Sequence, residues 1–350
     1  MSFLPTENVM PKNKASDISQ STETEVQEVK PSWIELRRKV RSVRSSKALF
    51  KAIDALTSMS QGSCPYLTAA QIKNIEVAKD KVYDDRDPQA CNFDVYRVSS
   101  EEKQPAIMLI HGGGFSAGDK KFRKGVAQYF AVSGFTVFCV NYGIAPDYVF
   151  PAPVKQLITA ANYIYDHADE YNIDCDKIIL QGDSAGGYYA SMLATMSANK
   201  EFNAKYGDDI KFEFCGAIYN CGLFDLDIVL QTKYIFDLDD GVFLSFIGHN
   251  RKDIDKFPYK EICMPSKFVN EKFPPCFFIY SPNDLLCKGQ AELMLDLLKD
   301  KDVYYESFKA RHVSSNHCFS LFWRGEDSFA ANEMMISFAR RLANDKIKLR

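Results

Sequence analysis

One stretch decides the fold: QGDSAGG at residues 181–187, which matches the pattern G-x-S-x-G. An apolar run precedes it and an Ala-rich run follows it, so we expect a strand, a sharp turn and a helix. In such a turn the residues two before and two after the serine must be very small, and Gly182 and Gly186 occupy those places. The Ser184 hydroxyl is then expected to point out of the sheet at the start of a helix. The pattern fixes only three residues, so a chance match stays open until other parts of the chain are considered.

A run of three glycines lies upstream of this turn, directly after a short apolar strand predicted at residues 106–110. Consecutive glycines cost conformational entropy, and a flexible linker seldom follows a buried strand directly. Glycine N–H groups can instead point at an oxyanion with no Cβ in the way. We therefore expect Gly113 and Gly114, together with Ala185 after the serine, to form an oxyanion hole. A merely flexible loop is the alternative interpretation.

Strands and helices alternate along the chain. Strand-like runs are predicted at residues 106–110, 135–140, 178–180, 212–219, 277–280 and 303–308. Helical runs lie between or after them, at residues 122–133, 154–171, 190–198, 291–298 and 328–343. This alternation predicts an α/β fold with a mostly parallel sheet and helices on both faces. Two earlier strand-like runs, 75–83 and 93–98, flank a turn-rich segment and predict a hairpin.

A nucleophilic serine needs a base and an acid that orients the base, in the chain order Ser, Asp or Glu, His. Asp284 directly follows the predicted strand 277–280, where such an acid is expected; a helix N-cap is its alternative role. Of the five histidines, His312 and His317 follow it. His312 comes after Lys309 and Arg311, a basic context that disfavours a neutral base. We therefore predict His317 as the base, with a surface-loop histidine as the alternative.

Composition narrows the class of protein. The chain has 350 residues, 46% of them hydrophobic, and a net charge of −3, which gives no overall attraction to nucleic acid. Ten cysteines form no C-x-x-C pair and no zinc-like spacing with histidine, which is typical of reduced, buried thiols in a cytoplasmic protein. Residues 1–30 lack the apolar core of a signal peptide, and no run reaches the ~20 apolar residues of a membrane span.

The chain is predicted to divide into three parts. Residues 1–31 are polar and are expected to form a disordered tail, and 32–72 an N-terminal helical segment with one basic face. That face is interpreted as solvated, with a membrane-surface or nucleic-acid helix as the alternative. Residues 73–350 are the expected catalytic domain, within which 222–273 break the strand–helix rhythm and are interpreted as an insertion that acts as a lid.

The motifs together resemble the hormone-sensitive-lipase-like family of α/β-hydrolases over residues 75–330. The resemblance rests on four pieces: His111 with its three glycines, GDSAGG at 182–187, Asp284 followed by Leu285, and His317 with Phe319. It implies an α/β-hydrolase fold with a helical cap, here residues 32–72 and 222–273, and activity as a carboxylesterase or lipase-like enzyme on esters of short or medium acyl chains.

The sequence departs from this family at two sites. Asn141-Tyr142-Gly143 stands where the family has D-Y-R, so the ion pair of that segment is lost. Tyr188 and Tyr189 stand where the family often has small or polar residues. Phe115, Tyr148 and Tyr188 are predicted to line the substrate pocket.

The predicted mechanism is attack of Ser184 on an ester carbonyl, with His317 as base, Asp284 orienting it, and hydrolysis of the resulting acyl-enzyme by water. No metal or organic cofactor is needed. The expected partner is a small ester molecule, not nucleic acid or membrane, and no oligomeric state is predicted. An amidase, formamidase or peptidase on the same triad is one alternative. A non-catalytic ligand-binding relative is another, disfavoured because His317 is present.

Overall fold

The computed structural model describes residues 51, 64–145, 147–207, 209–231, 246–247 and 251–347, and these contain an eight-stranded sheet. The strands are β1 (Ile75–Val82), β2 (Asn92–Val98), β3 (Gln104–Ile110), β4 (Thr136–Val140), β5 (Ile173–Asp183), β6 (Gly216–Asn220), β7 (Cys276–Tyr280) and β8 (Tyr305–Lys309). Their order across the sheet is β1-β2-β4-β3-β5-β6-β7-β8. β1 and β2 pair antiparallel, as do β2 and β4, and every later pairing is parallel. The predicted hairpin and mostly parallel sheet are confirmed.

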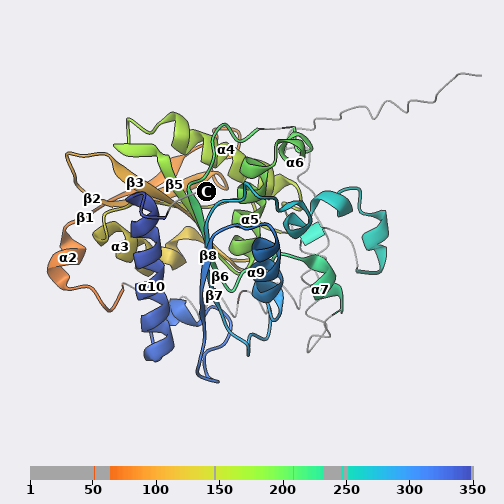
Figure 1. Ribbon diagram of the computed structural model, residues 1–350. Helices are drawn as coiled ribbons and strands as arrows, with labels where there is room; N and C mark the ends of the chain where they lie inside the picture. The colour runs from red at the N-terminus through yellow and green to blue at the C-terminus, as the bar shows by residue number, and fades with distance from the viewer. Residues whose placement is uncertain are drawn as a thin grey trace, which may run out of the picture. The chain divides into compact units, whose positions relative to one another are not determined.

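Helices cover both faces of the sheet (Figure 1). The α-helices are α2 (Ala69–Lys73), α3 (Lys124–Val132), α4 (Ala152–Asp166), α5 (Ala185–Ala198), α6 (Lys200–Ala204), α7 (Leu226–Gln231), α9 (Gln290–Asp300) and α10 (Gly325–Ala343). Short 3-10 helices are η2 (Lys120–Arg123), η4 (Arg251–Lys256), η5 (Lys260–Ile262), η6 (Pro265–Phe268) and η7 (Phe319–Phe322). None of the helices within these described ranges is long and apolar enough to cross a membrane.

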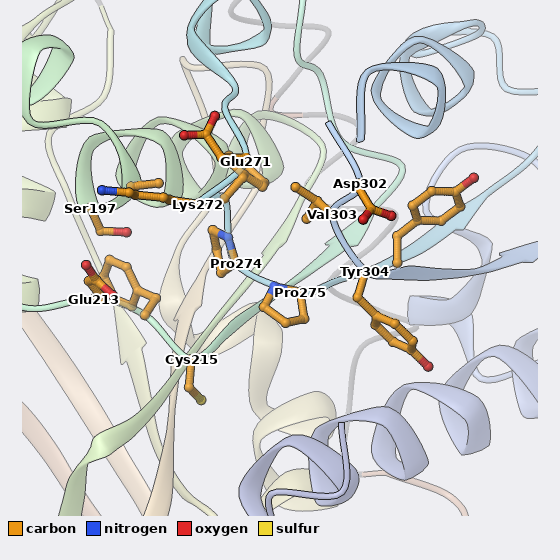
Figure 2. Close-up of a pocket in the computed structure, with 14 residues that line it drawn as sticks. Ser197, Glu213, Cys215, Glu271, Lys272, Pro274, Pro275, Asp302, Val303 and Tyr304 are labelled. Carbon is orange, nitrogen blue, oxygen red and sulfur yellow. The ribbon is translucent and has the colours of Figure 1, made fainter. Parts of the chain in front are cut away.

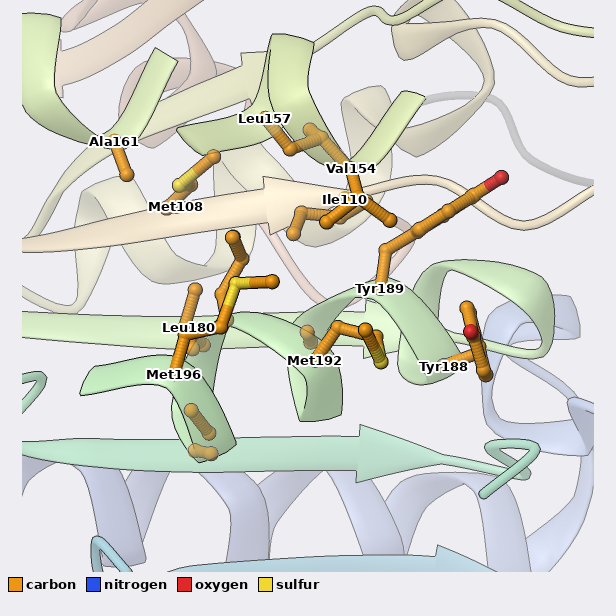
Figure 3. Packing of buried hydrophobic residues seen from close by; sticks show 14 of the residues in the cluster. Met108, Ile110, Val154, Leu157, Ala161, Leu180, Tyr188, Tyr189, Met192 and Met196 are labelled. Carbon is orange, nitrogen blue, oxygen red and sulfur yellow. The ribbon is translucent and has the colours of Figure 1, made fainter. Parts of the chain in front are cut away.

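Two hydrophobic cores form, one on each face, because successive side chains of a strand point to opposite sides. On β3, Met108 and Ile110 pack into the core under α4, α5 and α9, whereas Ile107 and Leu109 pack into the core under α3 and α10. Figure 3 shows Met108 and Ile110 against α4 and α5. With both faces covered, β3 and β4 carry the almost continuous apolar runs seen in the sequence.

Several predicted element boundaries are wrong. The strand predicted at 212–219 begins only at Gly216, because the ring of Phe212 leaves the strand and stacks on Tyr165 of α4 at 4.7 Å. The helix predicted at 154–171 ends at Asp166. The end of the predicted N-terminal segment 32–72 forms α2, which runs to Lys73 and which Thr68 and Gln71 start with a reciprocal capping box.

Other predictions fall on residues outside the described ranges. These include all of the predicted tail 1–31, most of the N-terminal segment 32–72, and residues 232–245 and 248–250 of the predicted lid. Within the rest of the lid segment the chain forms α7 and the short helices η4, η5 and η6. The division into tail, cap and catalytic domain stays a prediction.

Candidate active site

Ser184 lies at the turn between β5 and α5, with φ 51° and ψ −121°, a conformation that is strained for any residue with a side chain. A Cβ at Gly182 would lie 2.3 Å from the carbonyl oxygen of Gly186, and a Cβ at Gly186 would lie 2.1 Å from that of Ile110. Neither position admits a larger residue. The strand, sharp turn and helix predicted from the motif are confirmed.

The three-glycine loop packs directly on this turn. The N–H of Gly112 donates to Asp183 Oδ2 at 3.1 Å, and a Cβ at Gly112 would lie 3.0 Å from the Cβ of Ser184. Gly113 and Gly114 both have positive φ, 137° and 56°. The glycines therefore let the backbone approach the serine closely, beside the N-terminus of α5, where free N–H groups favour negative charge. Their part in an oxyanion hole stays a prediction.

His111, which starts this loop, is a structural residue. Its ring is buried and stacks on Tyr142 with centroids 4.5 Å apart, and Nδ1 lies 2.9 Å from the carbonyl oxygen of Gly112. Because a carbonyl oxygen only accepts, Nδ1 carries the proton. Burial lowers the pKa of His111 to about 4, so the ring is neutral.

Asp284 and His317, distant in sequence, form a hydrogen-bonded pair. Nδ1 of His317 lies 2.9 Å from Oδ2 and 3.0 Å from Oδ1 of Asp284. The N–H groups of Leu286 and Cys287 donate to Oδ1, each at 2.8 Å. Asp284 thus also closes the turn after β7. The alternative interpretation as a helix N-cap is wrong, because α9 begins at Gln290 and its N-cap is Gly289.

This pairing shifts both pKa values toward the charged forms. Burial favours a neutral His317, but the nearby Asp284 carboxylate outweighs it and raises the pKa of the imidazole. Burial likewise opposes a charged Asp284, but His317 and the two backbone donors lower the pKa of the carboxyl group. Asp284 is therefore an anion at neutral pH, able to fix the ring orientation and stabilise an imidazolium.

The loop of His317 meets the serine turn at the end of β6. The carbonyl oxygen of Asn220 accepts a hydrogen bond from the N–H of Ser184 at 3.0 Å, and the Cys318 thiol lies 3.7 Å from the same oxygen. Asn220, which sequence reasoning missed, thus links the two loops. Nothing in its local sequence distinguished it from any other residue at a strand end.

His312 lies apart from this pair. Its side chain is half exposed, and Nε2 lies 3.6 Å from Glu326. Its backbone N–H donates to Asp327, as does that of Arg311. His312 is therefore a surface histidine beside α10, and the structure pairs Asp284 with His317 instead.

A buried ion pair stands behind the serine. The Arg123 guanidinium forms a bidentate ion pair with the Asp183 carboxylate. Nε donates to Oδ1 and Nη2 donates to Oδ2, each at 2.6 Å. Sequence reasoning missed Arg123 and expected only the loss of an ion pair in the segment 141–143. Here the motif aspartate has a bidentate partner from η2, which holds it against the glycine loop.

Gly143, which stands where the family pattern has arginine, makes room for an aromatic ring. A Cβ there would lie 2.3 Å from Cγ of Tyr148, and the Gly143 N–H donates to Gln156 at 2.7 Å. Asn141 accepts from the N–H of Lys120 at 2.7 Å. These residues hold the connection after β4 by neutral hydrogen bonds.

The three predicted pocket residues are all buried. Phe115 packs edge-to-face on Tyr188 at 5.6 Å and lies 4.4 Å from the ring of Phe246. The Tyr188 hydroxyl donates to the carbonyl oxygen of Cys263 at 2.7 Å, and that of Tyr148 bonds to Asp87. Their part in binding a substrate stays a prediction.

A cavity of about 630 Å³ lies elsewhere, at the amino ends of β6, β7 and β8 (Figure 2). Cys215, Pro275 and Tyr304, each directly before one of these strands, line it. The serine turn is at the opposite, carboxyl edge of the parallel sheet, where ligands of such folds bind. The cavity is therefore separate from the candidate active site.

Comparisons with known proteins assign the chain to a family. The sequence model of the BD-FAE family matches residues 93–296. That segment runs from β2 through the glycine loop, the serine turn and Asp284 into α9. The chain belongs to the BD-FAE family. Its resemblance to hormone-sensitive-lipase-like α/β-hydrolases is likewise confirmed.

Relatives of this BD-FAE chain include a putative α/β hydrolase of Acanthamoeba polyphaga mimivirus, 26% identical over 270 residues, which cover 72% of the chain and 71% of the relative. An acetyl esterase of Salmonella paratyphi B is 33% identical over 200 residues, 52% of the chain and 56% of that esterase. The crystal structure of an inhibited esterase B from Lactobacillus rhamnosis superposes with a TM-score of 0.74 at 19% identity, covering 87% and 97% of the two chains. The α/β-hydrolase fold is thus confirmed.

Proposed function

We propose that the protein is a serine carboxylesterase that hydrolyses esters of short or medium acyl chains through an acyl-enzyme on Ser184. The observation that carries the proposal is the Asp284–His317 hydrogen bond. The loop that contains His317 meets the strained serine turn at Asn220. It supplies a base held by an anion beside a candidate nucleophile. Membership in the BD-FAE family and the similarity to acetyl esterases support ester hydrolysis as the reaction class.

In the acylation step, Ser184 Oγ attacks the ester carbonyl carbon while His317 Nε2 takes the hydroxyl proton. Asp284 holds Nδ1–H and stabilises the imidazolium, which then gives its proton to the leaving alcohol. The N–H groups of Gly113, Gly114 and Ala185 stabilise the oxyanion of the tetrahedral intermediate. Each such donor typically contributes about 2.7–4 kcal/mol to the transition state.

In the deacylation step, a water molecule attacks the Ser184 ester, again with His317 as base. The acid product leaves and the serine regains its proton. No metal ion and no organic cofactor takes part in either step of this proposal.

The substrate is a small ester, and its acyl and alcohol groups would lie between the serine turn and the cap. We assign the cap to residues 32–72 and 222–273, with 1–31 as a tail and 73–350 as the catalytic domain. Phe115, Tyr148 and Tyr188 are the proposed pocket residues; Phe115 follows the glycine loop and Tyr188 lies one helical turn after Ser184 on α5. The acetyl esterase relatives favour the short end of the acyl range.

The proposed compartment is the cytoplasm, since all ten cysteines are free thiols. The expected partner is the ester alone, without nucleic acid or membrane. An amidase, formamidase or peptidase would use the same residues, and a ratio of ester to amide turnover separates these from an esterase. A non-catalytic binding protein is disfavoured because His317 has its Asp284 partner.

The test is a panel of aryl and alkyl esters with acyl chains of increasing length, assayed with the wild type and with Ser184→Ala. The proposal expects a preference for short or medium chains and loss of turnover in the variant. His312→Ala and His317→Ala run beside it, and only the second should abolish activity. Undiminished hydrolysis by Ser184→Ala overturns the proposal.

A further inference from the structure

Three thiols surround the Asp284–His317 pair, and the proposed mechanism uses none of them. One set of metal-ligand atoms, from Cys221, His317 and Cys318, lies with all members within 4.8 Å of one another. A second set, from Asp284, Cys287 and His317, satisfies the same limit. The sequence showed no zinc-like spacing because these residues come from three separate loops.

The fold fixes these groups firmly. Cys221 directly follows β6, and its N–H donates to the carbonyl oxygen of Ile279 at 2.7 Å. Cys221 is 2% exposed and Cys318 is 7% exposed, while the His317 side chain retains 18% exposure. The two thiols are thus buried, and His317 is the most exposed of the three residues, so an ion from solvent would approach the site past the His317 ring.

The donor set has the chemistry of a soft-metal site. Two thiolates and an imidazole are the ligands that zinc takes in Cys/His sites, with Zn–S near 2.3 Å and Zn–N near 2.0–2.1 Å. Such bond lengths place neighbouring ligand atoms roughly 3–4 Å apart in a tetrahedron, so small side-chain rotations suffice. A water molecule would complete the tetrahedron as the fourth ligand.

We propose that Cys221, Cys318 and His317 form a binding site for a thiophilic divalent ion such as Zn²⁺, and that occupancy of this site inhibits the enzyme. The inhibitory part rests on the proposed function, because it assumes that His317 is the base. The binding part does not depend on any catalytic activity.

Metal capture fits these thiols better than oxidation to a disulfide. Oxidation to a disulfide needs an oxidant and proceeds through a thiolate, and both thiols are buried away from such a reagent. A divalent ion instead displaces the two thiol protons into solvent as the S–metal bonds form. The free energy of the S–metal bonds then offsets the free-energy cost of deprotonating the two thiols.

Inhibition is expected because each nitrogen of the His317 imidazole has a function in the proposed mechanism. Nδ1 donates to Asp284, and Nε2 is the atom proposed to take the serine proton. An ion on Nε2 removes the base, and an ion on Nδ1 breaks the bond that orients the ring. Either mode of coordination stops proton transfer at Ser184.

The experiment is a titration of the full chain with Cd²⁺, a spectroscopic probe for Zn²⁺ sites, recorded by the ultraviolet charge-transfer absorption of Cd–thiolate bonds and by ester hydrolysis in parallel. Cys221→Ser and Cys318→Ser remove one thiolate each. Cys215→Ser is the matched control, because Cys215 is a partly buried thiol before β6 at the far edge of the sheet. Thermal melting of each metal-free variant establishes that it is folded.

We expect stoichiometric absorption and chelator-reversible inhibition in the wild type and the control. Each site variant should bind Cd²⁺ at least about 100-fold more weakly, since loss of a second-shell partner alone costs 10–100-fold. If both folded site variants keep the wild-type absorption and inhibition, the proposal is wrong. If no ester is turned over, the absorption difference still decides whether the site binds metal, so the two proposals fail separately.

Discussion

At the scale of single residues, the His317–Asp284 pair sets the pH dependence of the proposed reaction. The base must be neutral, and the Asp284 carboxylate raises the pKa of His317 above its ordinary value of about 6.5. The neutral fraction grows as pH rises through this raised pKa. We therefore expect kcat/KM to fall on the acid side along a single-proton limb whose midpoint lies above pH 6.5, measured with a neutral ester.

Asp284→Asn removes the carboxylate that raises the pKa of His317, so the acid limb should move to lower pH. The orienting bond to Nδ1–H is lost at the same time, and kcat should fall on the order of 10⁴-fold, as when a triad aspartate is replaced in a serine protease. A full pH profile of kcat/KM checks both effects. An unchanged midpoint would mean that Asp284 does not control His317.

Arg123→Leu tests the ion pair behind the serine. Removing the guanidinium leaves the Asp183 carboxylate buried with only the Gly112 N–H as a donor among the contacts described above. Breaking a buried pair in this way typically costs about 3–5 kcal/mol of unfolding free energy. Urea denaturation of variant and wild type gives the difference.

The control is Lys103→Ala, which breaks the exposed pair of Lys103 with Asp169. Exposed pairs add little to stability, so this variant should unfold close to the wild type. Equal effects of the two substitutions would contradict the structural role given to Arg123.

At the scale of elements, the glycine loop and the serine turn act as one unit. A Cβ at Gly112 would lie 2.6 Å from Asp183 O and 3.0 Å from the Cβ of Ser184. Gly112→Ala should therefore move the loop away from the turn and remove oxyanion stabilisation. We expect kcat to fall on the order of 10²- to 10³-fold, measured on a variant with native circular dichroism.

Gly134→Ala is a matched control, since Gly134 lies after α3 with φ 95° and nothing within 4 Å of its missing Cβ. Alanine in that conformation costs roughly 1–2 kcal/mol of stability but touches no part of the site. Its kcat should equal that of the wild type. A similar loss of kcat in both variants would show a general effect of alanine on the fold.

Local patterns predicted the elements that depend on local chemistry. Gly182 and Gly186 revealed the turn because a Cβ does not fit at either position. Met108 lies in an unbroken run of apolar residues, which indicates a strand that is buried on both faces of the sheet. The start of β6 was not predictable, since Phe212 and Phe214 suit a strand as well as Tyr219 does, yet both lie before Gly216, where the strand begins. Only the stacking partner Tyr165, on another helix, takes Phe212 out of the strand.

At the scale of the whole molecule, the site depends on contacts that no sequence window contains. Arg123 reaches Asp183, and Cys221 approaches His317, across intervening strands and helices. Neither residue carries a local signal, because an arginine before a helix or a cysteine after a strand is ordinary. The order Ser, Asp, His was predictable only because the α/β-hydrolase topology places successive strand ends along one edge.

The predicted tail offers a test at this scale. The sheet and the Asp284–His317 pair both lie within residues 64–347. A protein that begins at residue 31 should therefore keep the melting temperature and the kcat/KM of the full chain. Differential scanning calorimetry with an ester assay checks this. Loss of activity would assign the tail a part in the catalytic unit.

Ser184 is the nucleophile on which the proposed mechanism depends. Its most direct test is peptide mass spectrometry of the protein after reaction with an activated phosphonate ester, which traps a serine nucleophile covalently. We predict one phosphonate per chain, on Ser184, with no labelling of Ser184→Ala and greatly slowed labelling of His317→Ala. A phosphonate found on another residue, or an unlabelled Ser184 in a protein that hydrolyses esters, would show that Ser184 is not the nucleophile.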